Sequence, residues 1–444
     1  MTYMSKLKRI LLTLTGTVSA VLPIAVSVSC GSSEDGKPSQ GRPSQYIQPD
    51  QRVAKVNANP AMTAEVAKAH PDAKLVYITD SGQITDKSFN QSSWEALNLI
   101  DDQTSTGIDY KAIQSEGQYE IAYNNALADG RNVWILSGFG HGSPIAQFIK
   151  AHVADMKQKN IKIIIVDTKV STKDLSDDQA ALDYVKTNVY SVEFLTQQAA
   201  YVVGYASSQY LADKYATDAA KRKISMFGGG AEPGVTNFIT GFLRGMLAWN
   251  KANADKKVTT NSAINLDSGF VPGSKMNQVI QDSLQQNPSF VMAVAGPATS
   301  AVIKALSDGG SKYSEVSVVG VDVDQSLADQ ANKKRYATSI TKNLAQAVYD
   351  VVLKVVYGLG TSSTEVNHNQ IEGLLQNWVG YAPSQLSGED KAKMDNNLQA
   401  AKAKYEALEN SEKEAIISNK LPDGSTDADS QTALVNALAA AVNS

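Results

Sequence analysis

Ten short β-rich runs alternate with helical stretches between residues 74 and 380, and this alternation restricts the chain to few architectures. Several of the runs are continuously apolar, as strands covered on both faces of a parallel sheet are. The pattern predicts doubly wound α/β units, in which ligands bind beyond the carboxyl ends of the strands. The predicted strands are 74–79, 110–114, 133–136, 161–166, 188–192, 222–227, 258–266, 290–295, 315–321 and 336–340, with helices over 88–101, 144–158, 193–210 and 233–249.

The composition excludes several classes of function. A chain of 444 residues with 43% hydrophobic residues can form two or three folded units. A net charge of −4, without a basic block beyond the first few residues, argues against a nucleic-acid partner. The single cysteine, Cys30, excludes an internal disulfide framework, a Cys-rich zinc site and an iron–sulfur cluster. Because the sequence also lacks an HExxH motif, a Walker A loop and a GxSxG elbow, we expect neither an enzyme nor a cofactor or metal.

The N-terminal residues indicate export. A basic stretch at 6–9 precedes a mostly apolar run at 10–26, and small residues lead to Cys30. This arrangement resembles a bacterial lipoprotein signal peptide spanning 1–30, in which the cysteine is the lipid attachment site. We therefore expect a lipoprotein held by acyl chains, palmitate among them, at the outer face of the cell membrane. The alternatives are an uncleaved membrane anchor or a buried free cysteine.

Residues 31–73 are polar and rich in proline. Such a segment buries too little apolar surface to offset its ordering entropy, so we expect a disordered tether. About forty flexible residues have a reach on the order of 35 Å.

Polar and aromatic residues gather after the predicted strands. Asp80 follows the first strand and leads into the run 86–90, and Asp167 follows the run 163–166, which is three isoleucines and a valine. Further residues of this kind are Phe270 in the turn 267–270, Gly296 after 290–295, Asp322 after 315–321 and Lys342 after 336–340. Since parallel strands end at one edge of their sheet, these residues are candidates for a common site.

Two groups of motifs resemble a known family. The runs 79–82, 86–90 and 94–95 resemble the opening signature of the basic membrane protein family, the nucleoside-binding lipoproteins of ABC transport systems. The run 320–325 resembles that family's second signature, and the resemblance extends over about residues 74 to 360.

The resemblance implies a type I periplasmic-binding-protein fold, in which a three-strand hinge joins two doubly wound α/β lobes. On that plan the chain crosses between the lobes near residues 191, 296 and 322. The expected divisions are lobe 1 over 74–191 plus 297–322, lobe 2 over 192–296 plus 323–380, and a helical C-terminal extension over 381–444. Apolar residues at helical spacing from Met394 to Leu408, and an Ala-rich run at 431–442, predict the helices of the extension.

The resemblance also implies the ligand-binding residues. Two phenylalanines, Phe89 and Phe270, would sandwich the base, since an aromatic ring stacked on a base contributes about 1–3 kcal/mol. The remaining residues are Asp80, Asn90 and Asp167 on the first lobe, where the carboxylates would accept base protons, and Gly296, Asp322 and Lys342, which would hold the ribose. Three carboxylates against one lysine favour a neutral nucleoside over a nucleotide.

Two glycine-rich runs allow other interpretations. The run 227–234 lacks the ending of a phosphate-binding loop, and we expect it to begin the first helix of the second lobe. In the run 137–142, Phe139 or His141 is a candidate ligand contact, and a purely conformational role for the loop is the alternative.

The sequence thus predicts a monomeric substrate-binding lipoprotein that captures a nucleoside such as adenosine or guanosine and passes it to an ABC permease and its ATPase. A sugar or another small polar molecule is an alternative ligand. A surface adhesin or antigen with a vestigial cleft, and a nucleoside-cleaving enzyme, are alternatives from other classes.

Overall fold

The computed structural model describes residues 45–360 and 368–444, and these residues form two six-stranded sheets. The strand order is β11-β5-β4-β3-β1-β2 in the first sheet and β12-β10-β9-β8-β6-β7 in the second. The paired strands are parallel except that β12 runs antiparallel to β10. The predicted α/β class with two parallel-sheet lobes is therefore confirmed.

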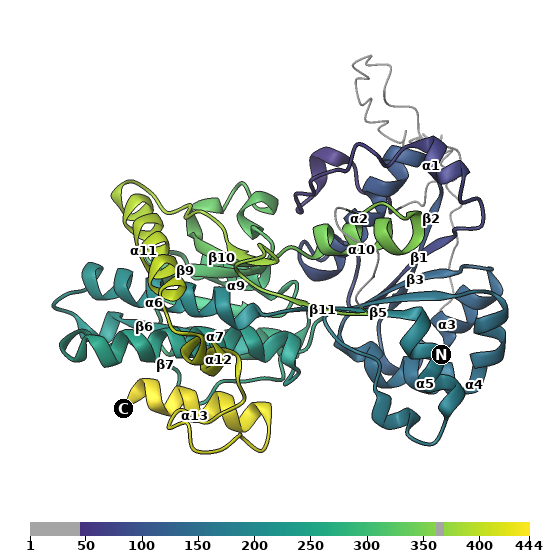
Figure 1. Ribbon diagram of the computed structural model, residues 1–444. Helices are drawn as coiled ribbons and strands as arrows, with labels where there is room; N and C mark the ends of the chain where they lie inside the picture. Colours follow the sequence, from purple (N-terminus) through teal and green to yellow (C-terminus); the bar gives the residue numbers. More distant parts are fainter. Residues whose placement is uncertain (1–44, 361–367) are drawn as a thin grey trace, which may run out of the picture. The chain divides into compact units, whose positions relative to one another are not determined.

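The first lobe has helices on both faces of its sheet, because alternate residues of its strands belong to two separate cores. In β4, Ile164 packs in the core with α2 and α10, whereas Ile163 and Ile165 pack with α3, α4 and α5 (Figure 1). The strands are β1 (Leu75–Ser81), β2 (Ile108–Ile113), β3 (Val133–Ser137), β4 (Lys162–Val166), β5 (Val189–Phe194) and β11 (Asn369–Glu372), and the helices are α2 (Phe89–Thr104), α3 (Tyr119–Ala128), α4 (Gly142–Gln158), α5 (Gln179–Asn188) and α10 (Leu344–Tyr357).

The second lobe repeats this layering. In β9, Val319 packs in the core with α6 and α7, and Val318 packs with α8 and α9. The strands are β6 (Lys223–Gly228), β7 (Thr259–Thr260), β8 (Phe290–Val294), β9 (Ser317–Asp322), β10 (Tyr336–Lys342) and β12 (Val379–Tyr381), and the helices are α6 (Thr196–Lys214), α7 (Pro233–Ala252), α8 (Ser274–Gln285) and α9 (Ala298–Asp308).

One predicted strand, 258–266, is reduced to the two residues of β7. The side chain of Asn261 takes over the pairing with the neighbouring strand: its Oδ1 accepts from Met226 N at 3.0 Å, and its Nδ2 donates to Met226 O at 2.9 Å. The side chain thus replaces the backbone ladder at this point, and backbone pairing with β6 resumes only at an isolated bridge between Asn265 and Phe227.

The predicted lobe boundaries are partly wrong. The chain passes from the first sheet to the second between β5 and α6, returns between β10 and α10, and passes again between β11 and β12. Only the first passage lies near a predicted crossing, residue 191. Segment 297–322 contains β9, which pairs with β8 and β10, so it belongs to the second lobe. Helix α10, which was assigned to the second lobe, packs on α2 of the first.

Residues 45–73 contradict the tether prediction, because they pack on the first lobe. Ile47, Val53 and Met62 are buried, and α1 (Ala64–Lys68) follows them. Helix α2 supplies the hydrogen-bond acceptors for this segment. Asn98 Oδ1 accepts from Ile47 N at 2.8 Å, and Glu95 accepts from Val53 N at 2.9 Å. Buried side chains of α2 thus accept hydrogen bonds from the backbone N–H groups of a polar segment that has few apolar residues of its own.

The remaining N-terminal predictions, namely the signal peptide at 1–30, the lipid attachment at Cys30 and the tether over 31–44, lie outside the described residues. Within the described ranges, no helix combines the length and the apolar character that crossing a membrane requires.

The C-terminal extension is helical, as predicted. Helix α11 (Glu389–Glu406) packs on α6 through a stripe of buried residues, Met394, Leu398, Ala401 and Tyr405. Helix α12 (Asn410–Ile417) follows, and α13 (Gln431–Asn443) packs on α7. The extension therefore adds a layer to the second lobe on its α6 and α7 side.

Candidate functional site

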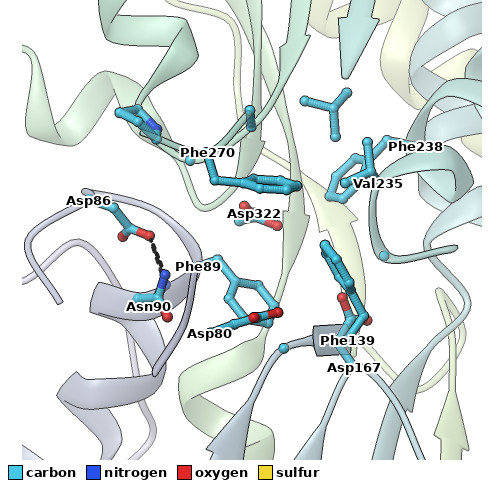
Figure 2. A pocket seen from close by; sticks show the side chains of 16 residues that line it. Asp80, Asp86, Phe89, Asn90, Phe139, Asp167, Val235, Phe238, Phe270 and Asp322 are labelled. Carbon is cyan, nitrogen blue, oxygen red and sulfur yellow. Dashed lines mark hydrogen bonds between the residues drawn. The ribbon is translucent and has the colours of Figure 1, made fainter. Parts of the chain in front are cut away.

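A pocket lies where strand ends of the two sheets meet, and it encloses about 560 Å³, including its open mouth (Figure 2). Its lining residues are Asp80, Asp86, Phe89, Asn90, Gly138, Phe139, Asp167, Gly234, Val235, Phe238, Phe270, Val294, Ala295, Gly296, Pro297 and Asp322. The structure therefore brings together every ligand-binding residue predicted from the sequence except Lys342, which lies next to the pocket and contacts Asp167.

Aromatic rings from both lobes face the pocket. Phe89 begins α2 of the first lobe, and Phe270 precedes α8 of the second. Figure 2 shows Phe270 across the pocket from Phe89 and Phe139. The ring centroids of Phe139 and Phe270 are 5.6 Å apart, with an angle of 57° between the planes. Phe139 therefore lines the pocket from the run 137–142.

Phe238 is an aromatic lining residue that the sequence did not reveal. It lies on α7, where an apolar residue at helical spacing looks like ordinary core, and it is 1% exposed. The ammonium of Lys342 is 4.8 Å from the centroid of its ring and 5.8 Å from that of Phe89. Both rings thus provide a face for the lysine's positive charge.

Asp80 lies near the carboxyl end of β1, and donors from two other segments fix its side chain. Its Oδ2 accepts from Gly140 N at 2.9 Å, and its Oδ1 accepts from the hydroxyl of Tyr119. Gly138 has a φ of +124°, and a Cβ there would lie 2.7 Å from Cγ of Asp80. A glycine is therefore required at this position both for the backbone angle and for the space that Asp80 occupies.

Asp86 lines the pocket but caps a helix. Its two oxygens accept from Ser88 N, Asn90 N, Asn90 Nδ2 and Gln91 N at 2.9–3.0 Å. A carboxylate has about four acceptor positions, so these donors occupy its capacity. Burial raises the pKa of Asp86, and the four hydrogen bonds oppose that shift. The residue organises the start of α2 and thereby places Phe89 and Asn90.

Asp322 ends β9 and reaches the first lobe. Its Oδ2 accepts from the hydroxyl of Ser88 at 2.7 Å. Burial raises the pKa of Asp322 to about 6, although the positive charge of Lys342 and the Ser88 hydrogen bond both lower it. This carboxyl therefore titrates close to neutral pH.

Asp167 and Lys342 form a second link between the lobes. Nζ of Lys342, at the end of β10, is 2.7 Å from Oδ2 of Asp167, which directly follows β4. The two side chains are 1% and 9% exposed. Lys342, which the sequence predicts beside the ribose, donates through its ammonium to Asp167 and to the carbonyl of Gly234 at 3.3 Å.

Backbone strain marks two of these carboxylates. Asp167 and Asp322 have φ values of +64° and +67°, in the left-handed region that non-glycine residues rarely adopt. Such conformations cost on the order of 1–3 kcal/mol and concentrate at functional sites. Gly296, also at a strand end, leaves room for Asp86, since a Cβ there would lie 3.3 Å from Oδ2 of Asp86.

His141, the other candidate of the run 137–142, is a core residue. It is fully buried, and its Nδ1 is 2.7 Å from the hydroxyl of Tyr123. Burial lowers the pKa of His141 to about 4, so its ring is neutral at pH 7. In the described ranges, no three His, Cys, Asp or Glu side chains are grouped so that they could hold a metal ion.

The pocket therefore combines aromatic faces with carboxylates from both lobes. The titratable side chains among its lining residues are the four carboxylates Asp80, Asp86, Asp167 and Asp322, and Lys342 beside the pocket pairs with Asp167. Such a surface stacks on a flat ring and accepts hydrogen bonds from amino, imino and hydroxyl groups.

Two named bacterial proteins are relatives of the chain. It is 26% identical over 342 residues to the ABC transporter nucleoside-binding protein BmpA of Lactococcus lactis subsp. cremoris, covering 74% of this chain and 88% of the relative. It is 24% identical to the CD4+ T-cell-stimulating antigen of Listeria monocytogenes, covering 72% of this chain and 82% of that protein.

Among solved structures, an ABC transporter solute-binding protein of Aeropyrum pernix K1 superposes with a TM-score of 0.57 at 17% identity, covering 78% of this chain and 89% of the other. This similarity supports the type I periplasmic-binding-protein fold. The family model described as "ABC transporter substrate-binding protein PnrA-like" matches residues 73–419. The chain therefore belongs to the Bmp family of extracytoplasmic ABC transporter substrate-binding proteins.

Proposed function

We propose that this substrate-binding protein captures a nucleoside, with a purine as the base, and delivers it to an ABC permease. The observation that carries the proposal is the pocket itself, where Phe89 and Phe270 from opposite lobes face a space bordered by carboxylates. The name of the Lactococcus relative, a nucleoside-binding protein, supports the same ligand class.

In this proposal the base lies between the rings of Phe89 and Phe270. Asp80 and Asp167 accept protons from the base, and Asn90 contributes to the same wall. Asp322 accepts from the ribose hydroxyls, with Gly296 providing room and Lys342 balancing the charge. A carboxylate that receives two hydroxyl protons suits a diol.

The charge of the pocket argues for a nucleoside without phosphate. A phosphate would enter among the carboxylates Asp80, Asp167 and Asp322, and the basic side chain of Lys342 beside the pocket is already paired with Asp167. Repulsion between these charges is poorly screened in a buried site. We therefore expect nucleotides to bind much more weakly than nucleosides.

Anchoring through Cys30 completes the proposal. The leader at 1–30 supports a lipoprotein at the outer face of the membrane, where it would work as a monomer beside the permease and its ATPase. Radiolabelled palmitate should label the wild-type protein in its host and should not label Cys30→Ser. Equal labelling of both would contradict the anchor.

Isothermal titration tests the ligand class. The protein without residues 1–30 is partially unfolded and refolded to remove carried-over ligand, and it is then titrated with nucleosides, free bases, ribose and nucleoside monophosphates. The proposal predicts micromolar or tighter binding confined to nucleosides. Binding of sugars alone, or no binding by protein that is shown to be folded, would contradict it.

A further inference from the structure

Two hydrogen-bond donors and a neighbouring glycine fix the orientation of the Asp80 carboxylate in the pocket. Its Oδ2 accepts from Gly140 N and its Oδ1 from Tyr119 Oη, so donors on two different elements hold the two oxygens. Gly138 lies directly against this side chain, and a Cβ at position 138 would overlap with Asp80. These contacts together set the orientation of the carboxylate, so losing one of them allows it to turn.

Of the two donors to Asp80 named above, Gly140 donates from its backbone and Tyr119 from its side chain. Tyr119 begins α3, is 4% exposed, and packs edge-on against His141 with ring centroids 5.1 Å apart. The ring is therefore held in place, and its hydroxyl points at the pocket wall and not at solvent.

The hydrogen bonds from Tyr119 and Gly140 orient the Asp80 carboxylate. The two donors, a phenol and an amide, carry no charge. His141 lies below them with a pKa that burial lowers to about 4, so it adds no positive charge at pH 7. A charged acceptor held in one orientation forms strong, directional hydrogen bonds with N–H donors.

We infer that Tyr119 is a positioning residue, whose hydroxyl orients the Asp80 carboxylate toward the edge of the bound base that carries hydrogen-bond donors. The preference of the protein for bases with amino or imino donors therefore depends on the Tyr119 hydroxyl. This inference rests on the proposed function. The inference narrows the expected ligands to nucleosides whose base carries an N–H donor at this edge, such as guanosine, inosine or adenosine. Purine riboside has no such donor on its base, so we expect it to bind more weakly.

Tyr119→Phe tests the inference, because it keeps the ring and removes only the hydroxyl. The measured quantity is the ratio of dissociation constants for purine riboside and inosine. We expect the wild-type preference for inosine to fall about tenfold in Tyr119→Phe, the size expected for losing a hydrogen bond to a charged group. Purine riboside should bind both proteins equally, which a general loss of folding would not allow.

Tyr123→Phe is the matched control. Tyr123 lies one turn further along α3 and is also buried, but its hydroxyl contacts His141 and not Asp80. Its removal should leave the ratio unchanged. In an Asp80→Asn background, Tyr119→Phe should have no further effect on the ratio. An equal change in both tyrosine variants, or an undiminished effect in Asp80→Asn, would overturn the inference.

Crystal structures of the unliganded variants keep the test independent of the ligand. We expect the Asp80 carboxylate to turn in Tyr119→Phe and to keep its orientation in Tyr123→Phe. An unchanged carboxylate in Tyr119→Phe would overturn the positioning role even if nucleosides bind. If the wild-type protein binds no nucleoside, the proposed function fails, and the orientation of Asp80 still decides the role of Tyr119.

Discussion

At the scale of single residues, the carboxylates of the pocket differ in what they have left to offer a ligand. Four protein donors occupy Asp86, whereas Ser88 is the donor to Asp322 among the described residues. Residues after strands could be predicted as site candidates because parallel strands end together. Ser88, Tyr119 and Phe238 could not, because their roles depend on contacts with distant segments.

Phe89→Ala should weaken the binding of nucleosides by one to two orders of magnitude, because a stacked ring contributes about 1–3 kcal/mol per base. Ribose alone should bind the variant and the wild type equally, since it has no base to stack. Titration calorimetry with both ligands measures the two effects. Unchanged nucleoside affinity would remove Phe89 from the base site.

Asp322 should make stability depend on pH. Its pKa is about 6 in the folded protein against a reference value of 3.8, so the folded state binds the proton more tightly. This contribution to stability is fully present below about pH 4 and is lost as the pH rises through about 6. Relative to Asp322→Asn, the free energy of unfolding of the wild type should fall by about 3 kcal/mol across that window.

Urea denaturation of both proteins at a series of pH values between 4 and 7 measures this difference. The comparison with the variant cancels the other titrating groups. Parallel curves for the two proteins would show that Asp322 has an ordinary pKa.

At the scale of elements, the hydrophobic pattern predicts most strands and helices, but it does not predict the ordered packing of the N-terminal segment 45–73. The predicted strands reappear with small shifts, except where Asn261 replaces the ladder after β7. Segment 45–73 looks unstructured because its own apolar residues are few. Its order depends on acceptors that α2 supplies from positions far along the chain, which local composition does not reveal.

Glu95→Ala should release this segment. Glu95 is 1% exposed and accepts from Val53 N and Ala54 N, and the variant leaves both donors unpaired. A cost of about 2–4 kcal/mol in the free energy of unfolding is expected. Limited proteolysis should then cut within 45–62. Glu120→Ala, at an exposed position of α3, is the control and should change stability by less than about 0.5 kcal/mol.

At the scale of the whole molecule, the number of lobes was predictable and their membership was not. A strand–helix–strand unit has the same pattern in either lobe, so the assignment of 297–322 and of α10 required the sheet pairing itself. Two buried contacts, Ser88 with Asp322 and Lys342 with Asp167, join the lobes beside the pocket. In the proposed function, ligand binding and the contact between the lobes therefore use the same carboxylates, Asp167 and Asp322.

Lys342→Met should destabilise the protein by about 3–5 kcal/mol, because it leaves Asp167 buried without its partner. Adding Asp167→Asn should recover part of the loss. Lys304→Met removes an exposed pair with Asp308 and should cost at most about 1 kcal/mol. Chemical denaturation compares the variants, and equal losses for the two lysines would show that the link between the lobes is not energetically important.

The position of the ligand tests the central claim most directly. A crystal structure of the protein grown with guanosine should show the base between Phe89 and Phe270, the base donors at Asp80 and the ribose hydroxyls at Asp322. A nucleoside bound elsewhere, or a pocket that stays empty at saturating guanosine, would contradict the account.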